Sequence, residues 1–348
     1  MSPAGEPVRV QAIAQTRNSV VPPQYVQPPE TRPAAKLTHH HKNEAAELSP
    51  PSINVAGEDT GRLKDEIGLA CRDWGAFSVV NHGVPIELLD QMRRVGKSFF
   101  EECDMEQKLK YSCDPNSPAS EGYGSRMLLA DNDSVLDWRD YFDHHTLPLS
   151  RRNPAKWPHY QPNYREVVAE YSDQMKVLAQ RLLGLISESL GLPSSCIEEA
   201  VGEFCQNITV GYYPPCPQPD LTLGLQSHSD MGAVTLLIQD NVEGLQVFKD
   251  GEWITVRPLH DGILVLLADQ TEIITNGKYR SCQHRALTNA ERARLSVATF
   301  HDPAKTRKVF PAFEPPIYHE VMYGDYVSSW YTKGPEGKRN IDALLIKY

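Results

Sequence analysis

The amino-acid sequence predicts an α+β fold in which helices buttress a β-sandwich or barrel, of which the jelly roll is one form. Helical periodicity dominates the first 200 residues, whereas short β-branched and aromatic runs follow from about residue 205. Turn signals such as Asp250-Gly251 and Asn276-Gly277 separate these later runs. We therefore expect four segments, namely a flexible N-terminal arm (1–50), an N-terminal helical region (51–200), a β-rich core (201–305) and a C-terminal helical segment (306–348).

The composition favours a globular protein that acts on a small molecule. The 348 residues carry a formal net charge of −10 without a dense Lys/Arg run, which disfavours nucleic acid and anionic membranes as partners. No apolar stretch is long enough for a signal peptide or a transmembrane helix. Seven cysteines occur without any CxxC pair, as is typical of a reducing compartment. We expect a cytoplasmic monomer that binds a small-molecule substrate.

The N-terminal half contains the helical signals. One short helix is expected near Val8–Gln15, and the triplet His39–His41 follows in a polar stretch where adjacent side chains do not converge on a metal. In the longest helical pattern an apolar face runs from Val167 to Leu190, and Gly191 ends it. The periodicity predicts helices over residues 60–74, 85–103 and 163–190, and a strand over 76–80.

The C-terminal half contains the strand signals. Short apolar runs alternate there with Gly, Pro, Asp and Asn, which predicts many short strands joined by close turns. The expected strands are Ile208–Tyr213, Ala233–Gln239, Leu245–Phe248, Trp253–Val256, Ile263–Leu267, Glu272–Thr275 and Leu295–Phe300.

The tripeptide His228-Ser229-Asp230 is a candidate metal site at the start of the strand-rich block. Residues i and i+2 of a strand point to the same face, so the imidazole and the carboxylate can bind one ion together. His284, in another strand-like run, is the candidate third ligand. Two histidines and one carboxylate are the facial ligand set of non-haem Fe(II) oxygenases. Alone, an H-x-D tripeptide is common, and a hydrogen-bonded core histidine beside a surface aspartate is the ordinary alternative.

A second motif with the same spacing, Arg294-Leu295-Ser296, follows His284 by ten residues. Arginine offers a planar fork to a carboxylate, and serine adds a hydroxyl donor to the same group. A buried arginine near a metal with open positions suits a dicarboxylate cosubstrate, of which one end binds the metal and the other binds the arginine. The alternative for Arg294 is a surface ion pair with a residue such as Glu291.

Several segments follow one another in a characteristic order and spacing. They are Cys71–Phe77, Val80–Pro85, Glu121–Gly124, Asp137–Tyr141, Tyr212–Cys216, Gly224–Asp230, Gly244–Val247, Ile274–Tyr279 and Arg294–Ser296. By these segments the chain, from about residue 50 to its end, resembles the plant-type Fe(II)/2-oxoglutarate-dependent dioxygenases. Within that family it looks most similar to the leucoanthocyanidin dioxygenase-like and jasmonate-induced oxygenase-like subgroup, also by its ending Gly334–Lys338.

The resemblance implies a double-stranded β-helix (jelly-roll) core behind an N-terminal helical region. It implies that Fe(II) is bound by the catalytic residues His228, Asp230 and His284. It also implies that Arg294, Ser296 and Tyr213 bind the distal carboxylate of 2-oxoglutarate. O2 would be the other cosubstrate, with ascorbate in support. The expected reaction hydroxylates or desaturates a small, largely apolar plant specialised metabolite or hormone, with succinate and CO2 as coproducts.

Two departures from the family pattern lie near these residues. Gly211 stands where the family usually has Asn, so one polar contact to the cosubstrate is expected to be missing or replaced. The usual Asn-Ile-Gly-Asp is here Leu266–Asp269, with Ala268 in place of the glycine, so local packing is expected to differ. Neither departure touches an expected metal ligand.

The candidate substrate-binding residues are Tyr141, Asp143, Thr209, Phe300 and Asp302. Even spacing places Phe300 and Asp302 on the face of Arg294, and Thr209 on that of Tyr213. Tyr141 and Asp143 align with pocket positions of flavonoid-acting relatives, although Asp143 stands where those often carry an aromatic residue. Thr209 stands where a Lys or Arg is frequent, which disfavours a carboxylate substrate. Arg126 and Arg139 could replace that charge, or could lie on the surface.

Two other classes of function remain as alternatives. One is a non-catalytic metabolite-binding protein of the same fold, which detectable succinate formation would exclude. The other is a family oxidase that does not consume 2-oxoglutarate, which the cosubstrate requirement of O2 uptake would identify. Flavonoids, coumarins, jasmonate-type hormones and alkaloids all remain open as substrates.

Overall fold

The structure is a computed structural model that describes most of the chain. The described ranges are 8–16, 18–33, 48–57, 60–114, 121–125, 135–333 and 339–347. Three features singled out in the sequence lie outside the described residues, namely His39–His41, Arg126 and Gly334–Lys338.

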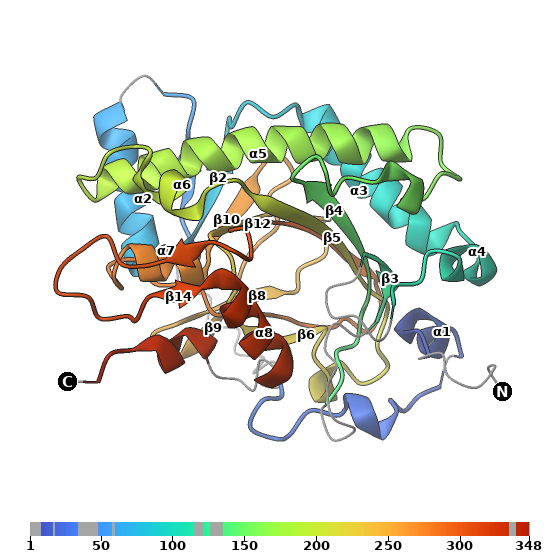
Figure 1. Ribbon diagram of the computed structural model, residues 1–348. Coiled ribbons are helices and arrows are strands. Elements are labelled where there is room, and N and C mark those ends of the chain that lie inside the picture. The colour runs from blue at the N-terminus through green and yellow to red at the C-terminus, as the bar shows by residue number, and fades with distance from the viewer. Residues whose placement is uncertain are drawn as a thin grey trace.

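An eight-stranded sheet crosses the molecule and draws strands from both halves of the chain (Figure 1). All its neighbouring strands pair antiparallel, except that β1 runs parallel to β2. In order across the sheet, the strands are β1 (Ser52–Asn54), β2 (Ala76–Val80), β10 (Ile263–Leu267), β7 (Val234–Gln239), β12 (Arg294–Asp302), β5 (Cys205–Tyr213), β4 (Asp140–Leu147) and β3 (Gly122–Gly124).

A smaller sheet packs against part of the inner face of the large one. A buried apolar cluster joins Leu237 and Leu264 of the large sheet to Leu245 and Val247 of the small sheet. This pairing of two mostly antiparallel sheets, with helices outside, confirms the predicted α+β jelly-roll class. The small sheet has the order β6 (Leu225–His228), β11 (His284–Ala286), β8 (Leu245–Lys249) and β9 (Glu252–Thr255), and a separate pair joins β13 (Lys308–Val309) to β14 (Val321–Met322).

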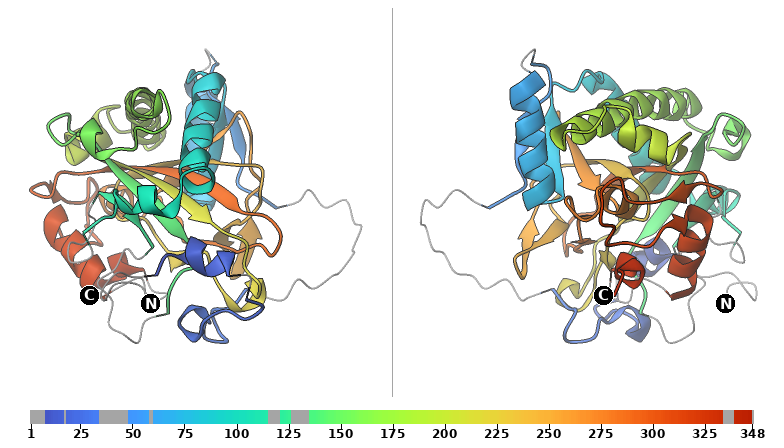
Figure 2. Two further views of the ribbon diagram at one scale, coloured as in Figure 1. Left: turned by 90° about the vertical axis from the view of Figure 1, so that its right-hand side faces the viewer. Right: turned by 60° about the vertical axis from the view of Figure 1, so that its left-hand side comes forward.

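A layer of helices covers the outer face of the large sheet (Figure 2). The long helix α5 (Tyr164–Ser189) lies across the strands because its apolar stripe, which includes Val168, Met175 and Leu182, is fully buried. Its neighbours are α2 (Thr60–Asp73) and α3 (Ile86–Glu101), both close to their predicted bounds. The remaining helices are α1 (Val10–Gln15), α4 (Met105–Leu109), α6 (Cys196–Val201), α7 (Asp269–Ile274) and α8 (Tyr323–Lys333), with 3-10 turns at Pro23–Tyr25, Pro154–Lys156, Pro219–Leu221 and Asn340–Leu344.

The described part of the expected N-terminal arm is packed against the body rather than loose. Val10, Val21 and Tyr25 are buried in a cluster with Trp138. The backbone N–H groups of Val10 and Gln11 donate to the two carboxylate oxygens of Asp140 in β4, at 2.9 Å each. Helix α1 is therefore attached directly to a strand of the large sheet.

The prediction of a strand over Glu272–Thr275 is wrong, because Glu272–Ile274 form the end of α7 and Thr275 is its C-cap. All six residues of α7 are buried, so the segment has no polar face from which a helical period could be read. Strand β4 was not predicted at all. Its polar residues Asp140, Asp143 and His144 are buried, whereas a sequence reading expects such residues outside.

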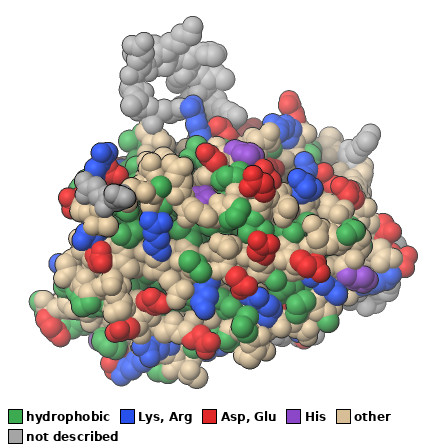
Figure 3. Space-filling view, turned by 90° about the horizontal axis from the view of Figure 1, so that it is seen from above, with side chains coloured by type: hydrophobic (Ala, Val, Ile, Leu, Met, Phe, Trp, Pro, Cys, Tyr) green, Lys and Arg blue, Asp and Glu red, His purple; other side chains and the backbone are tan. Residues whose placement is uncertain are grey.

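On the face over α5, acidic and basic side chains are interspersed rather than gathered into one patch of either sign (Figure 3). Within the described residues, no helix is long and apolar enough to cross a membrane. All seven cysteines are free thiols.

Candidate active site

Two neighbouring strands of the small sheet bring the candidate metal ligands together. His228 is the last residue of β6 and His284 the first residue of β11, and the two are direct partners in the antiparallel register. Asp230 lies two residues beyond the end of β6, in the turn that leads to β7. The expectation that His228 and Asp230 share a strand face was therefore wrong, although the turn returns the carboxylate to the same point.

The three side chains converge closely enough to hold one metal ion. Asp230 Oδ1 lies 3.6 Å from His228 Nε2 and 3.8 Å from His284 Nε2. The ligand atoms all lie within 4.8 Å of one another, and in the described part of the chain this is the one such group of His, Cys, Asp or Glu side chains. Two imidazoles and one carboxylate leave coordination positions open on an iron ion, so the donor set fits Fe(II).

Backbone carbonyl groups fix the orientation of both imidazoles. The carbonyl oxygen of Gln226 lies 2.8 Å from His228 Nδ1, and that of Cys282 lies 3.0 Å from His284 Nδ1. When each Nδ1–H donates to its carbonyl, each imidazole keeps its Nε2 lone pair free for a metal ion bound beside Asp230. Burial, and then the neighbouring His228, lower the pKa of His284 to about 4, so its imidazole is neutral at physiological pH.

Asp230 is held in its ionised form. Burial acts to raise its pKa, but the two imidazoles and the Thr235 hydroxyl outweigh that effect and lower it to about 2. The Thr235 hydroxyl donates to Asp230 Oδ2 at 2.5 Å, which leaves Oδ1 facing the histidines. A carboxylate and two neutral imidazoles are the protonation states that metal binding needs.

A buried guanidinium with unused donors lies on the inner face of the large sheet. Arg294 is only 2% exposed and donates through Nη2 to Gln239 Oε1 at 2.7 Å. Its Nε and Nη1 atoms are buried and have no hydrogen-bond partner among the described residues. Because burying an unpaired guanidinium is costly, these donors indicate a missing acceptor such as a carboxylate.

Tyr213 and Ser296 lie beside Arg294 on the neighbouring positions of the sheet. Tyr213 is the direct partner of Arg294 across β5 and β12, and the guanidinium carbon lies 4.9 Å from the centre of its ring. Ser296 is paired with Gly211. A Cβ atom at Gly211 would lie 3.3 Å from both the Ser296 and the Tyr213 hydroxyl oxygens, so the glycine leaves these two hydroxyls room for a ligand.

The candidate substrate residues share the inner face of the large sheet. Tyr141 is paired with Gly211, Asp143 with Thr209, and the Thr209 hydroxyl donates to Asp143 Oδ1 at 2.9 Å. Phe300 and Asp302 follow Ser296 at even spacing along β12, and Phe300 pairs with Thr235, the residue that holds Asp230. The β-sheet register therefore places all five on the inner face of the large sheet, the face on which the candidate metal ligands lie.

Sequence reasoning missed two residues of this face, Thr235 and Gln239. Both lie on β7, one beside Asp230 and the other beside Arg294. Polar residues at positions 235 and 239 of an otherwise apolar strand, four apart and so on one face, were the available signal. Arg139, for which surface exposure was an alternative, is buried with its guanidinium carbon 5.6 Å from the centre of the Tyr141 ring.

Two family models match the chain over the regions just described. Residues 204–303 match the 2OG-Fe(II) oxygenase superfamily, and residues 50–164 match the non-haem dioxygenase in morphine synthesis N-terminal family. Jasmonate-induced oxygenase 1 of Arabidopsis thaliana is 39% identical over 97% of this chain and 86% of its own.

The chain belongs to the 2OG-Fe(II) oxygenase superfamily. Another relative, flavonol synthase/flavanone 3-hydroxylase of Petunia hybrida, is 35% identical over 95% of this chain and 96% of its own. A crystal structure of JOX2 in complex with 2OG, Fe and JA superposes with a TM-score of 0.90 and 36% identity over 99% of both chains. The protein is thus a 2-oxoglutarate-dependent dioxygenase whose cofactor is Fe(II) and whose cosubstrates are 2-oxoglutarate and O2.

Proposed function

We propose that this oxygenase oxidises a C–H bond of a small, largely apolar organic molecule at iron bound by His228, Asp230 and His284. Hydroxylation and desaturation are the two outcomes of such an oxidation. The observation that carries the proposal is the convergence of these three side chains at one point, within 4.8 Å of one another, with the pKa values of both Asp230 and His284 lowered. When bound there, iron supplies O2 activation coupled to the decarboxylation of 2-oxoglutarate to succinate and CO2.

The cosubstrate is proposed to bind through its distal carboxylate at Arg294. The free Nε and Nη1 atoms can donate to one carboxylate, and the hydroxyls of Ser296 and Tyr213 lie beside them. Gln239 holds the third guanidinium nitrogen and so fixes the plane of the fork. The chain thus orients the dicarboxylate with one end at Arg294 and the other directed toward the metal ligands.

The substrate is proposed to lie against Tyr141, Asp143, Thr209, Phe300 and Asp302. Two of these five carry carboxyl groups. Burial raises the pKa of Asp143 to about 7, and the Thr209 hydrogen bond only partly opposes it; burial also raises the pKa of Asp302. Asp230 and Glu121 add negative charge nearby, which Arg139 and Arg151 partly offset. A carboxylate substrate would be desolvated beside these groups, so we propose that neutral or cationic molecules are preferred.

Cosubstrate dependence tests the reaction class against both alternative functions. Anaerobic protein loaded with Fe(II) is mixed with O2, with and without 2-oxoglutarate, and both O2 uptake and succinate are measured. We expect succinate only with both cosubstrates, and none in His228→Ala or Asp230→Ala. O2 uptake without 2-oxoglutarate would establish the oxidase alternative, and no succinate with any substrate would favour the binding protein.

Substrate charge is tested separately with sets of small molecules that differ in one group. Each set contains a carboxylic acid, its methyl ester and the corresponding amine, and substrate-stimulated succinate formation is the readout. We expect the ester and amine to stimulate more strongly than the acid, and Asp143→Asn to narrow the difference. A preference for the acid would contradict the proposed role of the two carboxyl groups. Strong stimulation by a jasmonate-type acid would be the clearest contradiction, and it is worth testing because the JOX2 structure contains JA.

We further propose that the protein acts as a cytoplasmic monomer, with the oxidation chemistry in residues 201–305 and the helical region 51–200 in support. The seven free cysteines support a reducing compartment. Light scattering coupled to gel filtration tests the oligomeric state, and a mass near twice 39.1 kDa would contradict it.

A further inference from the structure

The short helix α7 lies between the two segments that carry the candidate iron ligands. On one side its first turn binds the turn that follows Asp230. The backbone N–H of Asp269 donates to the Asp230 carbonyl at 2.9 Å, and that of Gln270 donates to the Gly232 carbonyl at 2.8 Å. The Thr271 hydroxyl donates to the Ala233 carbonyl at 2.7 Å. The helix start therefore fixes the backbone on which Asp230 stands.

On its other side α7 holds the segment that leads to His284. The side chain of Glu272 is fully buried, and its Oε2 atom accepts hydrogen bonds from the backbone N–H of Ser281 at 2.6 Å and from the Ser281 hydroxyl at 3.0 Å. The next residue, Cys282, supplies the carbonyl that accepts from His284 Nδ1. The Glu272 carboxylate thus anchors the segment before β11, and this segment sets the orientation of the His284 imidazole.

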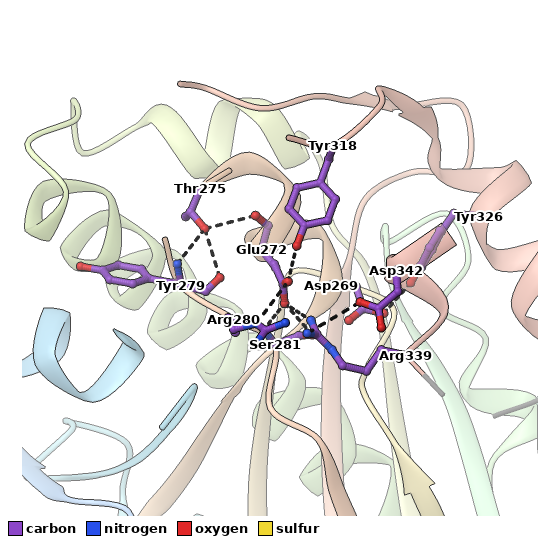
Figure 4. A network of polar contacts seen from close by, with 10 residues as sticks. All are labelled: Asp269, Glu272, Thr275, Tyr279, Arg280, Ser281, Tyr318, Tyr326, Arg339 and Asp342. Carbon is purple, nitrogen blue, oxygen red and sulfur yellow. Dashed lines mark hydrogen bonds and ion pairs between the residues drawn. The ribbon is translucent and has the colours of Figure 1, made fainter. Parts of the chain in front are cut away.

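The two buried carboxylates of α7 are met by side chains from the last part of the chain (Figure 4). The Tyr326 hydroxyl, from α8, donates to Asp269 Oδ2 at 2.5 Å. The Tyr318 hydroxyl donates to Glu272 Oε1, and the Arg339 guanidinium pairs with Glu272 Oε2. Arg339 also donates to the Ser281 hydroxyl at 3.0 Å. We call Tyr318, Tyr326 and Arg339 the C-terminal clasp.

Charge explains why α7 depends on the clasp. Asp269 and Glu272 are both fully buried. Two carboxyl groups on one short helix, close to a third at Asp230, repel one another unless a cation is present. Arg339 forms an ion pair with fully buried Glu272, and its own side chain is only 14% exposed. Removing that cation leaves the buried carboxylate with only the exposed Arg280, 4.0 Å away, as a cationic partner, which favours a shift of α7.

We propose that the C-terminal clasp sets the geometry of the iron site. Arg339 and Tyr326 are positioning residues that act through Glu272 and Asp269 on His284 and Asp230, more than 50 residues away in sequence. This inference rests on the proposed assignment of the iron ligands. It predicts that changes in the clasp alter metal affinity and the coupling of 2-oxoglutarate consumption to product, and not stability alone.

The test measures Co(II) and Fe(II) binding by anaerobic titration in the full-length protein, alongside thermal unfolding of the metal-free form. We expect Arg339→Gln to weaken metal binding about 10-fold, the lower end of the range for residues that support metal ligands. Tyr326→Phe, which removes one hydroxyl, should weaken it less. Arg72→Gln breaks an exposed ion pair with Asp73 and is the matched control, with no expected change.

Charge rescue separates positioning from general destabilisation. In the double variant Glu272→Gln/Arg339→Gln the carboxylate and the cation are removed together, so metal affinity should recover toward the wild-type value even if the unfolding temperature does not. Variants that unfold at a lower temperature but bind metal as tightly as the wild type would overturn the proposal.

Coupling gives a second readout in the same proteins. The ratio of succinate to oxidised product should rise in Arg339→Gln, because a displaced ligand misplaces the oxidising centre relative to the substrate. An unchanged ratio together with unchanged affinity would also overturn the proposal. If the wild type itself bound no metal, or His284→Ala bound it normally, the ligand assignment would fail instead, and the two failures are therefore distinguishable.

Discussion

The two faces of the large sheet use the same strands in opposite ways. One row of paired residues on the outer face consists of Phe142, Val210, Val297 and Ile238, all 0–1% exposed beneath the helices. The adjacent inner row consists of Tyr141, Gly211, Ser296 and Gln239. The outer row packs against the apolar core beneath the helices. The inner row lies beside Arg294, whose Nε and Nη1 atoms have no hydrogen-bond partner among the described residues. A buried guanidinium with two donors that lack partners thus marks the inner face as the one at which an anionic ligand is needed.

The largest expected effect is the difference between alanine variants of two buried histidines, one on each side of the large sheet. His284, on the inner side, should be required for metal, and His284→Ala should reduce succinate formation to background while the unfolding temperature of the metal-free protein changes little. His144, on the outer face, contacts the Ile208 carbonyl at 2.9 Å and the Tyr164 hydroxyl at 3.0 Å. His144→Ala should lower stability and leave metal binding intact. The comparison fails if the two variants lose the same property.

The outer row should respond to loss of volume. Phe142 is fully buried, and its ring centre lies 5.1 Å from that of Phe99 in α3. Phe142→Ala should lower the free energy of unfolding by about 3–5 kcal/mol, because transfer and cavity costs add. Urea unfolding monitored by circular dichroism measures the change. A loss below about 1 kcal/mol would mean that the helices do not close tightly over this face.

Removing the unpaired arginine should separate function from stability. Arg294→Gln should raise the KM for 2-oxoglutarate by about 10- to 100-fold, since each charge-assisted hydrogen bond is worth about 1.5–3 kcal/mol. The cosubstrate-free protein should be at least as stable as the wild type, because a buried unpaired charge disappears. Arg292→Gln, on the exposed loop before β12, is the control. Reduced stability without a change in KM would mean that Arg294 stabilises the fold and does not bind 2-oxoglutarate.

The smallest expected effect concerns the pH dependence of stability. Burial raises the pKa of Asp143 to about 7 in the folded protein, so the folded state binds its proton more tightly than the unfolded state does. Stability from this group is present below the unfolded pKa and is lost as pH rises toward 7. Asp143→Asn should therefore gain stability relative to the wild type as the pH rises from 4 to 8. Chemical unfolding of both proteins at pH 4 and at pH 8 measures this change. A stability difference between variant and wild type that is the same at both pH values would contradict the raised pKa of Asp143.

The apolar period of the sequence was sufficient to predict the outer layer of the fold. Helices α2, α3 and α5 begin and end within about two residues of expectation, because each has one buried stripe and a polar face. The period carries no such information for α7, which is buried on all sides, or for β4, whose buried face includes aspartates and histidines. These two failures lie beside the candidate site, where polar residues are buried for reasons other than packing.

The candidate site was predictable in its residue types and less so in its geometry. His228, Asp230 and His284 do meet, yet Asp230 reaches the others from a turn rather than from the strand. The Arg294 and Ser296 pair does follow strand spacing. Local spacing could not show that Arg339 pairs with Glu272, because 67 residues separate them and only the fold brings them together.

The attachment of α1 to Asp140 has a consequence for how such an enzyme can diversify. Asp140 precedes Tyr141 in β4, is fully buried, and accepts hydrogen bonds from Val10 and Gln11 as well as from Tyr123. A mutation in residues 8–16 therefore reaches the back of the strand that carries Tyr141 and Asp143, two of the proposed substrate residues. Natural selection or laboratory evolution could in this way change substrate preference through substitutions in α1, without altering any of the proposed substrate residues.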